Sequence, residues 1–305
     1  MKASVFVPAT IGNVGPGFDC FGLCVGSLGD IITIELTKNP SEIVATEGVD
    51  AAAVPKDPQR NCTVIAALSM LKMLGDTRNV RVSYKKQIPV SGGLGSSAAA
   101  SVGGALGAIL AAGKPIDRRL VALAALDGEE SVAGRHLDNI APCITGGLSI
   151  VRDTQSTDFS ALAIIPNWWI TVVTPAYRLD TKIARSVLPL EVKRELMVAQ
   201  MAHASSLVLA FANNDPALAS RALNDLYAEP CRSPLLPKFV EAKAAAIKAG
   251  ALGASISGAG PTIFAISETE KIAINVRENI CKIYGNTSLA HTSKIPTEGA
   301  RQVAI

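Results

Sequence analysis

Residues 89–101 read PVSGGLGSSAAAS and carry the parts of a phosphate-binding loop. Glycine adopts backbone angles that are closed to other residues, so a glycine-rich turn can direct several amide N–H groups to one point. The alanines that follow favour a helix, whose first turn adds free N–H groups and a positive dipole end. Two hydroxyls, Ser96 and Ser97, stand at the junction, where they can cap the helix, contact phosphate oxygens or ligate Mg²⁺. This junction predicts a cradle for a triphosphate.

The loop on its own does not identify a class of protein. It lacks the Gly-Lys-Ser/Thr of a Walker A loop and the Gly-x-Gly-x-x-Gly of a dinucleotide fold. A lone glycine loop before an alanine helix is more often structural than functional. Two further glycine-rich segments accompany it, PATIGNVGPGFDCFGLCV at residues 8–25 and SGAGPTIFAI at residues 257–266. Together the three segments span nearly the whole chain.

The elements that must position these segments are strands and helices in both halves of the chain. Apolar, β-branched runs predict strands at residues 4–9, 31–36, 80–84, 146–151, 169–174, 254–257 and 262–267. Apolar residues at helical spacing predict helices at residues 61–74 (with Asn61 as N-cap), 96–112, 117–132 (with Asp117 as N-cap), 191–213, 216–228 and 238–249. This mixture favours an α+β class. A polar stretch around residues 152–166 predicts two domains, residues 1–165 and residues 166–305.

Composition excludes several classes of function. The 305 residues are 49% hydrophobic and 18% charged, so a sizeable core is expected and global disorder is not. The net charge of +3, with no block of Lys and Arg, argues against a nucleic-acid or membrane partner. Six cysteines without a Cys-x-x-Cys pair indicate reduced thiols and a cytoplasmic protein, and three scattered histidines argue against a zinc site.

The three glycine-rich segments resemble, in the same order, the three motifs of the GHMP kinases, a superfamily of small-molecule kinases. The first, Pro-Ala-Thr-x-x-Asn-x-Gly-x-Gly-Phe-Asp, is most similar to that of the homoserine kinases, and segments 136–142, 184–189 and 229–237 agree with the same family. The resemblance implies ATP-dependent phosphorylation of the side-chain hydroxyl of L-homoserine, in threonine biosynthesis. It also implies an N-terminal domain like the second domain of ribosomal protein S5, followed by a ferredoxin-like C-terminal domain.

By this resemblance, the loop and the helix after it hold ATP. The residues assigned to the nucleotide are Pro89, Ser91, Gly92, Gly93, Leu94, Gly95, Ser96 and Ser97, with Asn61 next to adenine. Ser97 and Glu129 are assigned to Mg²⁺, with Glu130 as the alternative, because the segment before the histidine varies in length. The family often has a longer turn where this chain has Ser-Gly-Gly, so the register of the loop amides stays open by about one residue.

A site for homoserine needs a cation for the carboxylate, an anion or carbonyl for the ammonium, and a polar group near the hydroxyl. Arginine suits the carboxylate because its planar fork can bind in a bidentate manner. Arg185 and Arg232 lie in segments that match the family, so we assign them to the carboxylate. The resemblance places Asp19 near the ammonium or the hydroxyl and Asn13 near the hydroxyl.

The resemblance adds His136 and Gly258 to the substrate site and places Asn139 close to the transferred phosphate. The expected catalytic residues are Asn139, Asp19 and Glu129. Some GHMP kinases deprotonate the hydroxyl with an Asp–Lys pair, but the first motif of this chain has no matching lysine. We therefore predict direct in-line transfer without a strong general base, driven by positioning and electrostatic stabilisation.

Two alternatives stay open at this point. The first is a GHMP kinase for another small alcohol, such as shikimate or a mevalonate-type substrate. The second is a GHMP-fold protein that binds a small molecule without turning over ATP, which would not need the metal residues. The resemblance also implies a homodimer, with a small molecule as the other partner.

Overall fold

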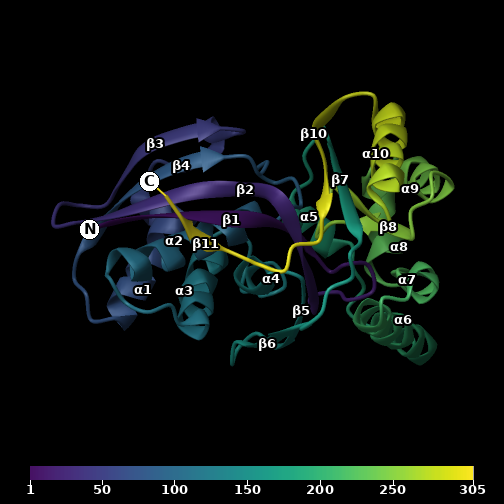
Figure 1. Ribbon diagram of the computed structural model, residues 1–305, viewed down its shortest axis with the longest axis horizontal. Helices are drawn as coiled ribbons and strands as arrows, with labels where there is room; N and C mark the ends of the chain where they lie inside the picture. Colours follow the sequence, from purple (N-terminus) through teal and green to yellow (C-terminus); the bar gives the residue numbers. More distant parts are fainter. Residues whose placement is uncertain (305) are drawn as a thin grey trace.

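The computed structural model describes residues 1–304, with Ser288 described by its backbone alone, and its elements form two lobes side by side (Figure 1). The strands of the first lobe are β1 (Lys2–Gly12), β2 (Phe21–Thr37), β3 (Glu42–Gly48), β4 (Asn79–Lys86), β5 (Leu148–Asp153), β6 (Asp158–Ala161) and β11 (Arg301–Val303). Its helices are the short 3-10 turns η1 (Ala51–Ala53) and η2 (Pro58–Arg60), then α1 (Cys62–Met73), α2 (Ser96–Ala111), α3 (Arg118–Glu130) and α4 (Ile140–Thr145).

The sheet of the first lobe follows the order β11-β1-β2-β4-β3, and β5 joins it beside β2 and carries β6. Helices α1, α2 and α3 pack against each other, and α2 lies on β1 and β2 (Figure 1). Small residues permit this close packing, since a Cβ at Gly103 of α2 would lie 2.5 Å from Ile32 Cδ1. The helix that begins at the phosphate loop is therefore fixed directly on the sheet that carries the first glycine-rich segment.

The second lobe contains β7 (Trp169–Pro175), β8 (Gly253–Ile256), β9 (Ile263–Ser267) and β10 (Thr287–Lys294). Its helices are α5 (Thr181–Ser186), α6 (Arg194–Asn213), α7 (Pro216–Ala222), α8 (Ala228–Arg232), the 3-10 turn η3 (Ser233–Leu235), α9 (Phe239–Lys248) and α10 (Glu270–Tyr284). The antiparallel strand order β10-β7-β9-β8, with α9 and α10 packed on the sheet, is the ferredoxin-like arrangement. The expected fold of this half is confirmed.

The last residues of the chain return to the first lobe. After β10 the chain runs back along the molecule to β11, which pairs with β1 so that Val303 lies opposite Ser4 (Figure 1). The boundary at residue 166 falls in the connection between β6 and β7. The division into residues 1–165 and 166–305 stays a prediction, and β11 adds a late segment to the sheet of the first half.

The helix predicted at residues 216–228 is wrong in its second half. Helix α7 ends at Ala222, because Leu223 leaves helical backbone angles. The Asp225 carboxylate then accepts hydrogen bonds from three backbone N–H groups, those of Tyr227, Ala228 and Glu229, and so begins a new helix, α8. This break turns the chain so that α8 carries Arg232 toward the other lobe. The helix predicted from residue 191 likewise begins later, at Arg194.

Candidate active site

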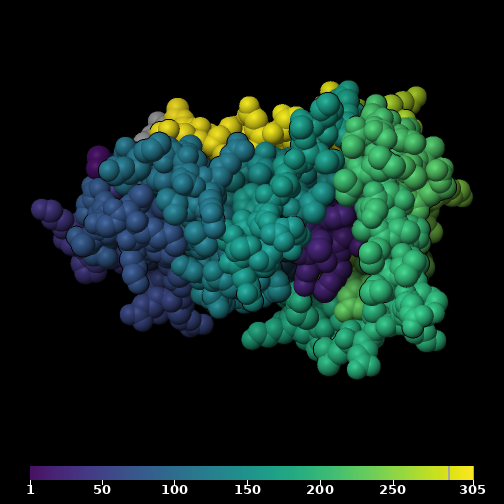
Figure 2. Space-filling view, turned by 90° about the horizontal axis from the view of Figure 1, so that it is seen from below, coloured from purple at the N-terminus to yellow at the C-terminus, as the bar shows by residue number. Residues whose placement is uncertain are grey.

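The three glycine-rich segments meet where the two lobes join. Ser257 Oγ donates to the Gly93 carbonyl at 2.5 Å, which ties the third segment to the phosphate loop. The Gly258 N–H donates to the Gly12 carbonyl at 3.0 Å, which ties the third segment to the first. In the space-filling view, the purple N-terminal segment reaches the surface between the teal and green parts of the chain (Figure 2). The three segments, although far apart in sequence, thus lie together at the junction of the two lobes.

The phosphate loop has a backbone shaped for an anion. Ser91, Gly93 and Gly95 all have positive φ, at 58°, 83° and 65°. The Gly92 carbonyl accepts from the Thr262 hydroxyl at 2.5 Å, so the loop carbonyls are held by the third segment. Within residues 1–304, the N–H groups of Gly92, Gly93 and Gly95 donate to no other residue. Helix α2 starts directly after Gly95 without a side-chain cap, so its first turn is open to a phosphate.

The remaining loop residues and Asn61 have structural surroundings. Pro89 and Leu94 are buried, so they can shape the loop by packing only. Asn61 caps α1 as predicted, because its Oδ1 accepts two backbone N–H groups of the first turn and the Tyr84 hydroxyl. Its Nδ2 donates to the Pro55 carbonyl. Both ends of the Asn61 amide are therefore used inside the protein, and its contact with adenine stays a prediction that these bonds do not support.

One buried carboxylate oxygen next to the loop lacks a partner. Ser97 Oγ donates to Glu129 Oε1 at 2.8 Å, while Glu129 Oε2 is buried without a hydrogen bond. Burial, the main cause, raises the pKa of Glu129 to about 7. Glu130 is different, since its side chain is 59% exposed and pairs with Arg135 at 3.0 Å. Of the two adjacent glutamates, only Glu129 faces Ser97.

These oxygens fit the Mg²⁺ that the resemblance to small-molecule kinases implies. Magnesium is bound by oxygen ligands, commonly one or two carboxylates together with the phosphates of a substrate. Among the described residues 1–304, no group of three or more His, Cys, Asp or Glu side chains could hold a metal ion. An ion at Ser97 and Glu129 would take its remaining ligands from water and from phosphate oxygens.

Comparisons with known proteins identify the family. The GHMP kinase N-terminal domain matches residues 61–147, and the GHMP kinase C-terminal domain matches residues 207–286. Homoserine kinase from Pyrococcus abyssi is 38% identical over 272 residues, which cover 89% of this chain and 90% of that protein. Homoserine kinase from Chloroherpeton thalassium is 32% identical over 311 residues, which cover 97% of this chain and 98% of that protein. The chain belongs to the homoserine kinase family.

Solved structures agree with the two-domain GHMP kinase fold. The crystal structure of homoserine kinase from Cytophaga hutchinsonii superposes with a TM-score of 0.94 at 34% identity, covering 99% of this chain and 97% of that chain. Mevalonate kinase from L. major, in complex with R-mevalonate, superposes with a TM-score of 0.77 at 14% identity, which shows a shared fold alone. The fold expected from the three motifs is confirmed.

In this member of the homoserine kinase family, a charged cluster lies beside the phosphate loop. Arg185 forms a bidentate pair with Asp19, with both N–O distances at 3.0 Å and both side chains partly exposed. Arg232 is only 3% exposed and donates to the Gly258 carbonyl at 2.8 Å and to a carbonyl of α5. The Phe18 ring lies 5.6 Å from the Arg185 guanidinium and 5.5 Å from that of Arg232. Both predicted carboxylate ligands are thus held at one place.

Asn13 connects the first segment to this cluster. Its Oδ1 accepts the Asp19 N–H at 3.0 Å, and its Nδ2 donates to the Gly258 carbonyl at 3.2 Å. Asn13, Val14 and Asp19 all adopt positive φ, at 68°, 49° and 54°. Such angles are uncommon outside glycine and are a genuine outlier for a β-branched residue such as Val14. The first segment is therefore held in a strained shape that presents Asp19 to Arg185.

Asn139 stands between the first segment and the phosphate loop. Its Oδ1 accepts from Thr10 Oγ1 at 2.9 Å. Its amide nitrogen lies beside the Asp138 carboxylate, next to Gly12 of the first segment. A Cβ placed at Gly95 would lie 3.0 Å from Asn139 Oδ1. His136, on the same connection, is half-buried, and burial followed by the charge of Arg185 lowers its pKa. The residues predicted around the reacting groups thus lie close together.

Sequence reasoning missed three buried ionisable residues, Asp138, Asp30 and Lys86. Asp138 is buried next to Asn139, and burial, followed by the nearby charge of Asp19, raises its pKa to about 7. Asp30 and Lys86 form a buried ion pair behind the loop. A signal for the pair existed, because both residues occupy the apolar, inward-facing register of β2 and β4. A charged side chain on the buried face of a strand needs a partner of opposite charge, so such a residue in the sequence indicates a buried ion pair.

Proposed function

We propose that this protein transfers the γ-phosphoryl group of ATP to the side-chain hydroxyl of L-homoserine, giving O-phospho-L-homoserine and ADP in threonine biosynthesis. One observation carries the proposal: homoserine kinases align with 89% and 97% of the chain at 38% and 32% identity. The reaction breaks the bond between the γ-phosphorus and its bridging oxygen. It forms a bond from that phosphorus to the homoserine oxygen, whose proton passes to solvent.

On the nucleotide side, the free N–H groups of Gly92, Gly93 and Gly95 would bind phosphate oxygens at the open start of α2. Ser97 and Glu129 would hold Mg²⁺, and the unpartnered Glu129 Oε2 supports this assignment. A bound Mg²⁺ supplies neutralisation of charge on the phosphate oxygens. The phosphate loop and the metal residues then fix the nucleotide relative to the cluster at Asp19.

On the acceptor side, the Arg185–Asp19 pair supports recognition of an amino acid. Homoserine carries the same two charges, so its carboxylate can bind Arg185 while its ammonium binds Asp19. The exchange costs little, because exposed ion pairs are worth about 0–1 kcal/mol in water. Arg232 would add a second cation for the carboxylate, and His136 and Gly258 would complete the wall of the site.

For the transfer itself, we propose that positioning provides most of the catalysis, without a strong general base. Asn139 lies beside Gly95 of the phosphate loop, and its amide would donate to the transferred group. Asn13 would hold the homoserine hydroxyl in line with the γ-phosphorus, while Asp19 holds the ammonium of the same substrate. Holding the reacting groups in register can supply several kcal/mol of the barrier, and charge stabilisation supplies more.

We also propose a cytoplasmic homodimer. Each of the six cysteines within residues 1–304 is free, which agrees with a reducing compartment. Helix α6 exposes Met197, Val198, Met201 and Leu209, an apolar surface that a second copy could cover. By length and composition α6 could also cross a membrane, but one such helix is weak support for that. Sedimentation equilibrium of the purified protein tests the dimer, and a monomer at micromolar concentration would contradict it.

Release of ADP from Mg·ATP, followed with L-homoserine, mevalonate, shikimate and no acceptor, tests the reaction. We expect turnover with homoserine at least about 100 times faster than with the other acceptors. Turnover with another alcohol would keep the phosphate loop but overturn the substrate assignment. ATP binding without turnover of any acceptor would overturn the assignment as a kinase.

A further inference from the structure

The ion pair of Asp30 and Lys86 lies entirely inside the protein. Their side chains are 0% and 3% exposed, and Lys86 Nζ lies 2.5 Å from Asp30 Oδ2. Burying two charges is costly, and a buried pair is often no more stable than well-packed apolar residues of the same volume. Stability alone therefore does not explain why a charged pair occupies the apolar face of two central strands.

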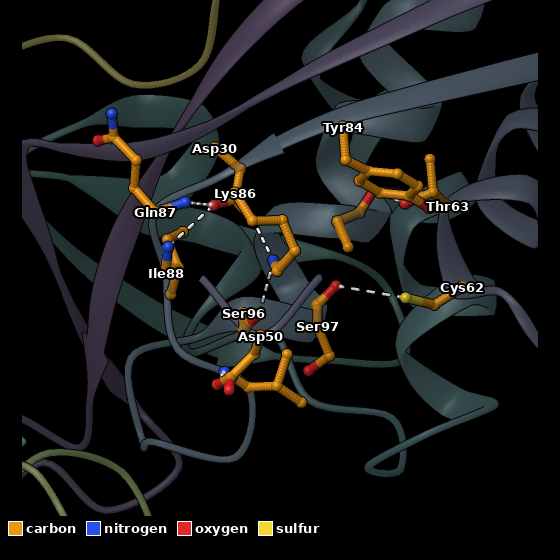
Figure 3. Close-up of polar contacts among 12 residues, drawn as sticks. Asp30, Asp50, Cys62, Thr63, Tyr84, Lys86, Gln87, Ile88, Ser96 and Ser97 are labelled. Carbon is orange, nitrogen blue, oxygen red and sulfur yellow. Dashed lines mark hydrogen bonds and ion pairs between the residues drawn. The ribbon is translucent and has the colours of Figure 1, made fainter. Parts of the chain in front are cut away.

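Lys86 makes a second contact, with the phosphate loop. Its Nζ lies 3.2 Å from the Oγ of Ser96, the first residue of α2 (Figure 3). An ammonium group has donors only, so Ser96 Oγ must accept this hydrogen bond. Within residues 1–304, no other group bonds to Ser96 Oγ. The Ser96 proton is consequently free to point out of the protein, toward the open end of the helix.

The neighbouring hydroxyl has the opposite polarity. Ser97 Oγ donates its proton to Glu129 Oε1, so its lone pairs are left for a cation. Ser96 is thus set as a donor, as a phosphate requires, and Ser97 as an acceptor, as a metal ion requires. The two adjacent serines therefore have different hydrogen-bonding roles, because Lys86 donates to Ser96 whereas Glu129 accepts from Ser97.

Asp30 connects the Lys86–Ser96 contact to the backbone that leads into the phosphate loop. Its Oδ1 accepts the Gln87 N–H at 2.7 Å and the Ile88 N–H at 2.9 Å (Figure 3). These two residues connect the end of β4 to the phosphate loop. The same carboxylate therefore holds both the Lys86 ammonium and the backbone that leads into the loop.

We propose that Lys86, held by Asp30, is a positioning residue for the nucleotide phosphates. It fixes Ser96 Oγ as a hydrogen-bond donor to a phosphate oxygen at the start of α2. This inference rests on the proposed use of ATP. It means that phosphate binding depends on Lys86, although the Lys86 side chain is buried.

The test compares Lys86→Met, Ser96→Ala and the double variant Lys86→Met/Ser96→Ala, with Lys85→Met as the matched control. Lys85 precedes Lys86 in β4 but is exposed, so it controls for loss of one positive charge. We expect KM for ATP to rise about tenfold or more in both single variants, as loss of a charge-assisted hydrogen bond implies. KM for homoserine and the inhibition constant of adenosine, which has no phosphate, should change less than twofold. The double variant should be no worse than Ser96→Ala.

Lys86→Met leaves Asp30 without its cation, so Asp30→Asn/Lys86→Met provides a folded variant without the charged pair, checked by circular dichroism. It should show the same selective rise in KM for ATP. Equal weakening of adenosine and ATP would overturn the inference, because Lys86 would then act on the base or on the fold. Additive effects of Lys86→Met and Ser96→Ala would also overturn it. Unchanged KM for ATP with normal homoserine turnover would sink this inference alone, whereas a wild-type protein that binds no ATP would sink the proposed function.

Discussion

At the residue scale, two adjacent glutamates have different surroundings, and this difference predicts different tasks. Glu129 accepts from Ser97 and keeps a buried, unpartnered oxygen, whereas Glu130 is exposed and pairs with Arg135. Glu129→Gln keeps the size and one acceptor oxygen but removes the charge that would hold Mg²⁺. We expect kcat to fall about 100-fold or more, because charge stabilisation dominates phosphoryl transfer.

Glu130→Gln is the matched control and should change kcat less than twofold. Initial rates measured over a range of Mg²⁺ concentrations check both variants, and Glu129→Gln should need more Mg²⁺ for half-maximal rate. Equal losses in the two variants would remove Glu129 from the metal site.

Arg232 offers a test of carboxylate binding. Its guanidinium is held by two carbonyls, one of them that of Gly258. Arg232→Lys keeps the charge but loses the planar fork, so KM for homoserine should rise about tenfold or more while KM for ATP stays within twofold. Arg135→Lys, at an exposed pair, is the control. If KM for ATP and KM for homoserine rose equally in Arg232→Lys, Arg232 would lie outside the substrate site.

The motif residues could be predicted because each stands in a short, contiguous pattern. Arg185, Asp19 and Arg232 were assigned by pattern, and the structure brings them together around Phe18. The contribution of Lys86 could not be predicted in this way. The role of Lys86 depends on its ion pair with Asp30. Asp30 lies on another strand, and only the register of the sheet places the two residues side by side.

At the element scale, the start of α2 must combine a left-handed residue with close packing. Gly95 has a φ of 65°, and a Cβ there would lie 2.1 Å from Thr10 Oγ1. Gly113, just past the other end of α2, has a similar φ of 69° but no atom within 4 Å of its Cβ position. A substitution at Gly113 therefore tests the cost of positive φ alone, whereas one at Gly95 tests positive φ together with a steric clash.

Gly113→Ala should lower the free energy of unfolding by about 1–2 kcal/mol, the cost of a left-handed non-glycine residue, without changing kcat. Gly95→Ala should cost more, because Thr10 must also move, and should lower kcat/KM for ATP at least about 100-fold. Urea unfolding and initial rates measure both effects. If Gly95→Ala retained full activity, the phosphate loop would not need its observed shape.

Some elements were predictable and some were not. The cap of α1 by Asn61 and the start of α3 after Asp117 were readable from cap residues followed by apolar periodicity. The break between α7 and α8 was not, because it depends on Asp225 gathering three N–H groups from the following turn. Strand β11 has only three residues, Arg301–Val303, and it is extended because it pairs with β1. Such pairing leaves no pattern in three residues of sequence.

At the scale of the whole molecule, the buried acid Asp138 couples stability to pH. Its folded pKa is raised to about 7, mainly by burial, so the folded state keeps its proton when the unfolded chain has already lost it. The contribution of Asp138 to stability is therefore complete below about pH 4 and is lost as pH rises toward 7. Asp138→Asn removes this loss.

The unfolding free energy of Asp138→Asn minus that of the wild type should therefore increase between pH 4 and pH 7, by about 2–4 kcal/mol, and then level off. Urea unfolding of both proteins without ligands, at half-unit steps of pH, gives this difference directly. A difference that does not vary with pH would mean that Asp138 titrates alike in the folded and unfolded chains.

The whole molecule brings one site together from distant segments. The first and third segments and the phosphate loop touch through Gly258, Gly12, Ser257 and Gly93, and Arg232 arrives from the second lobe. The central claim is that this junction is a homoserine kinase site.

The most direct test is ³¹P NMR of the purified protein with Mg·ATP and L-homoserine. We predict that the γ-phosphate signal of ATP is replaced by a phosphomonoester signal that matches O-phospho-L-homoserine, in equal amount with ADP. Loss of ATP to inorganic phosphate alone, or no change while ATP is shown to bind, would contradict the claim.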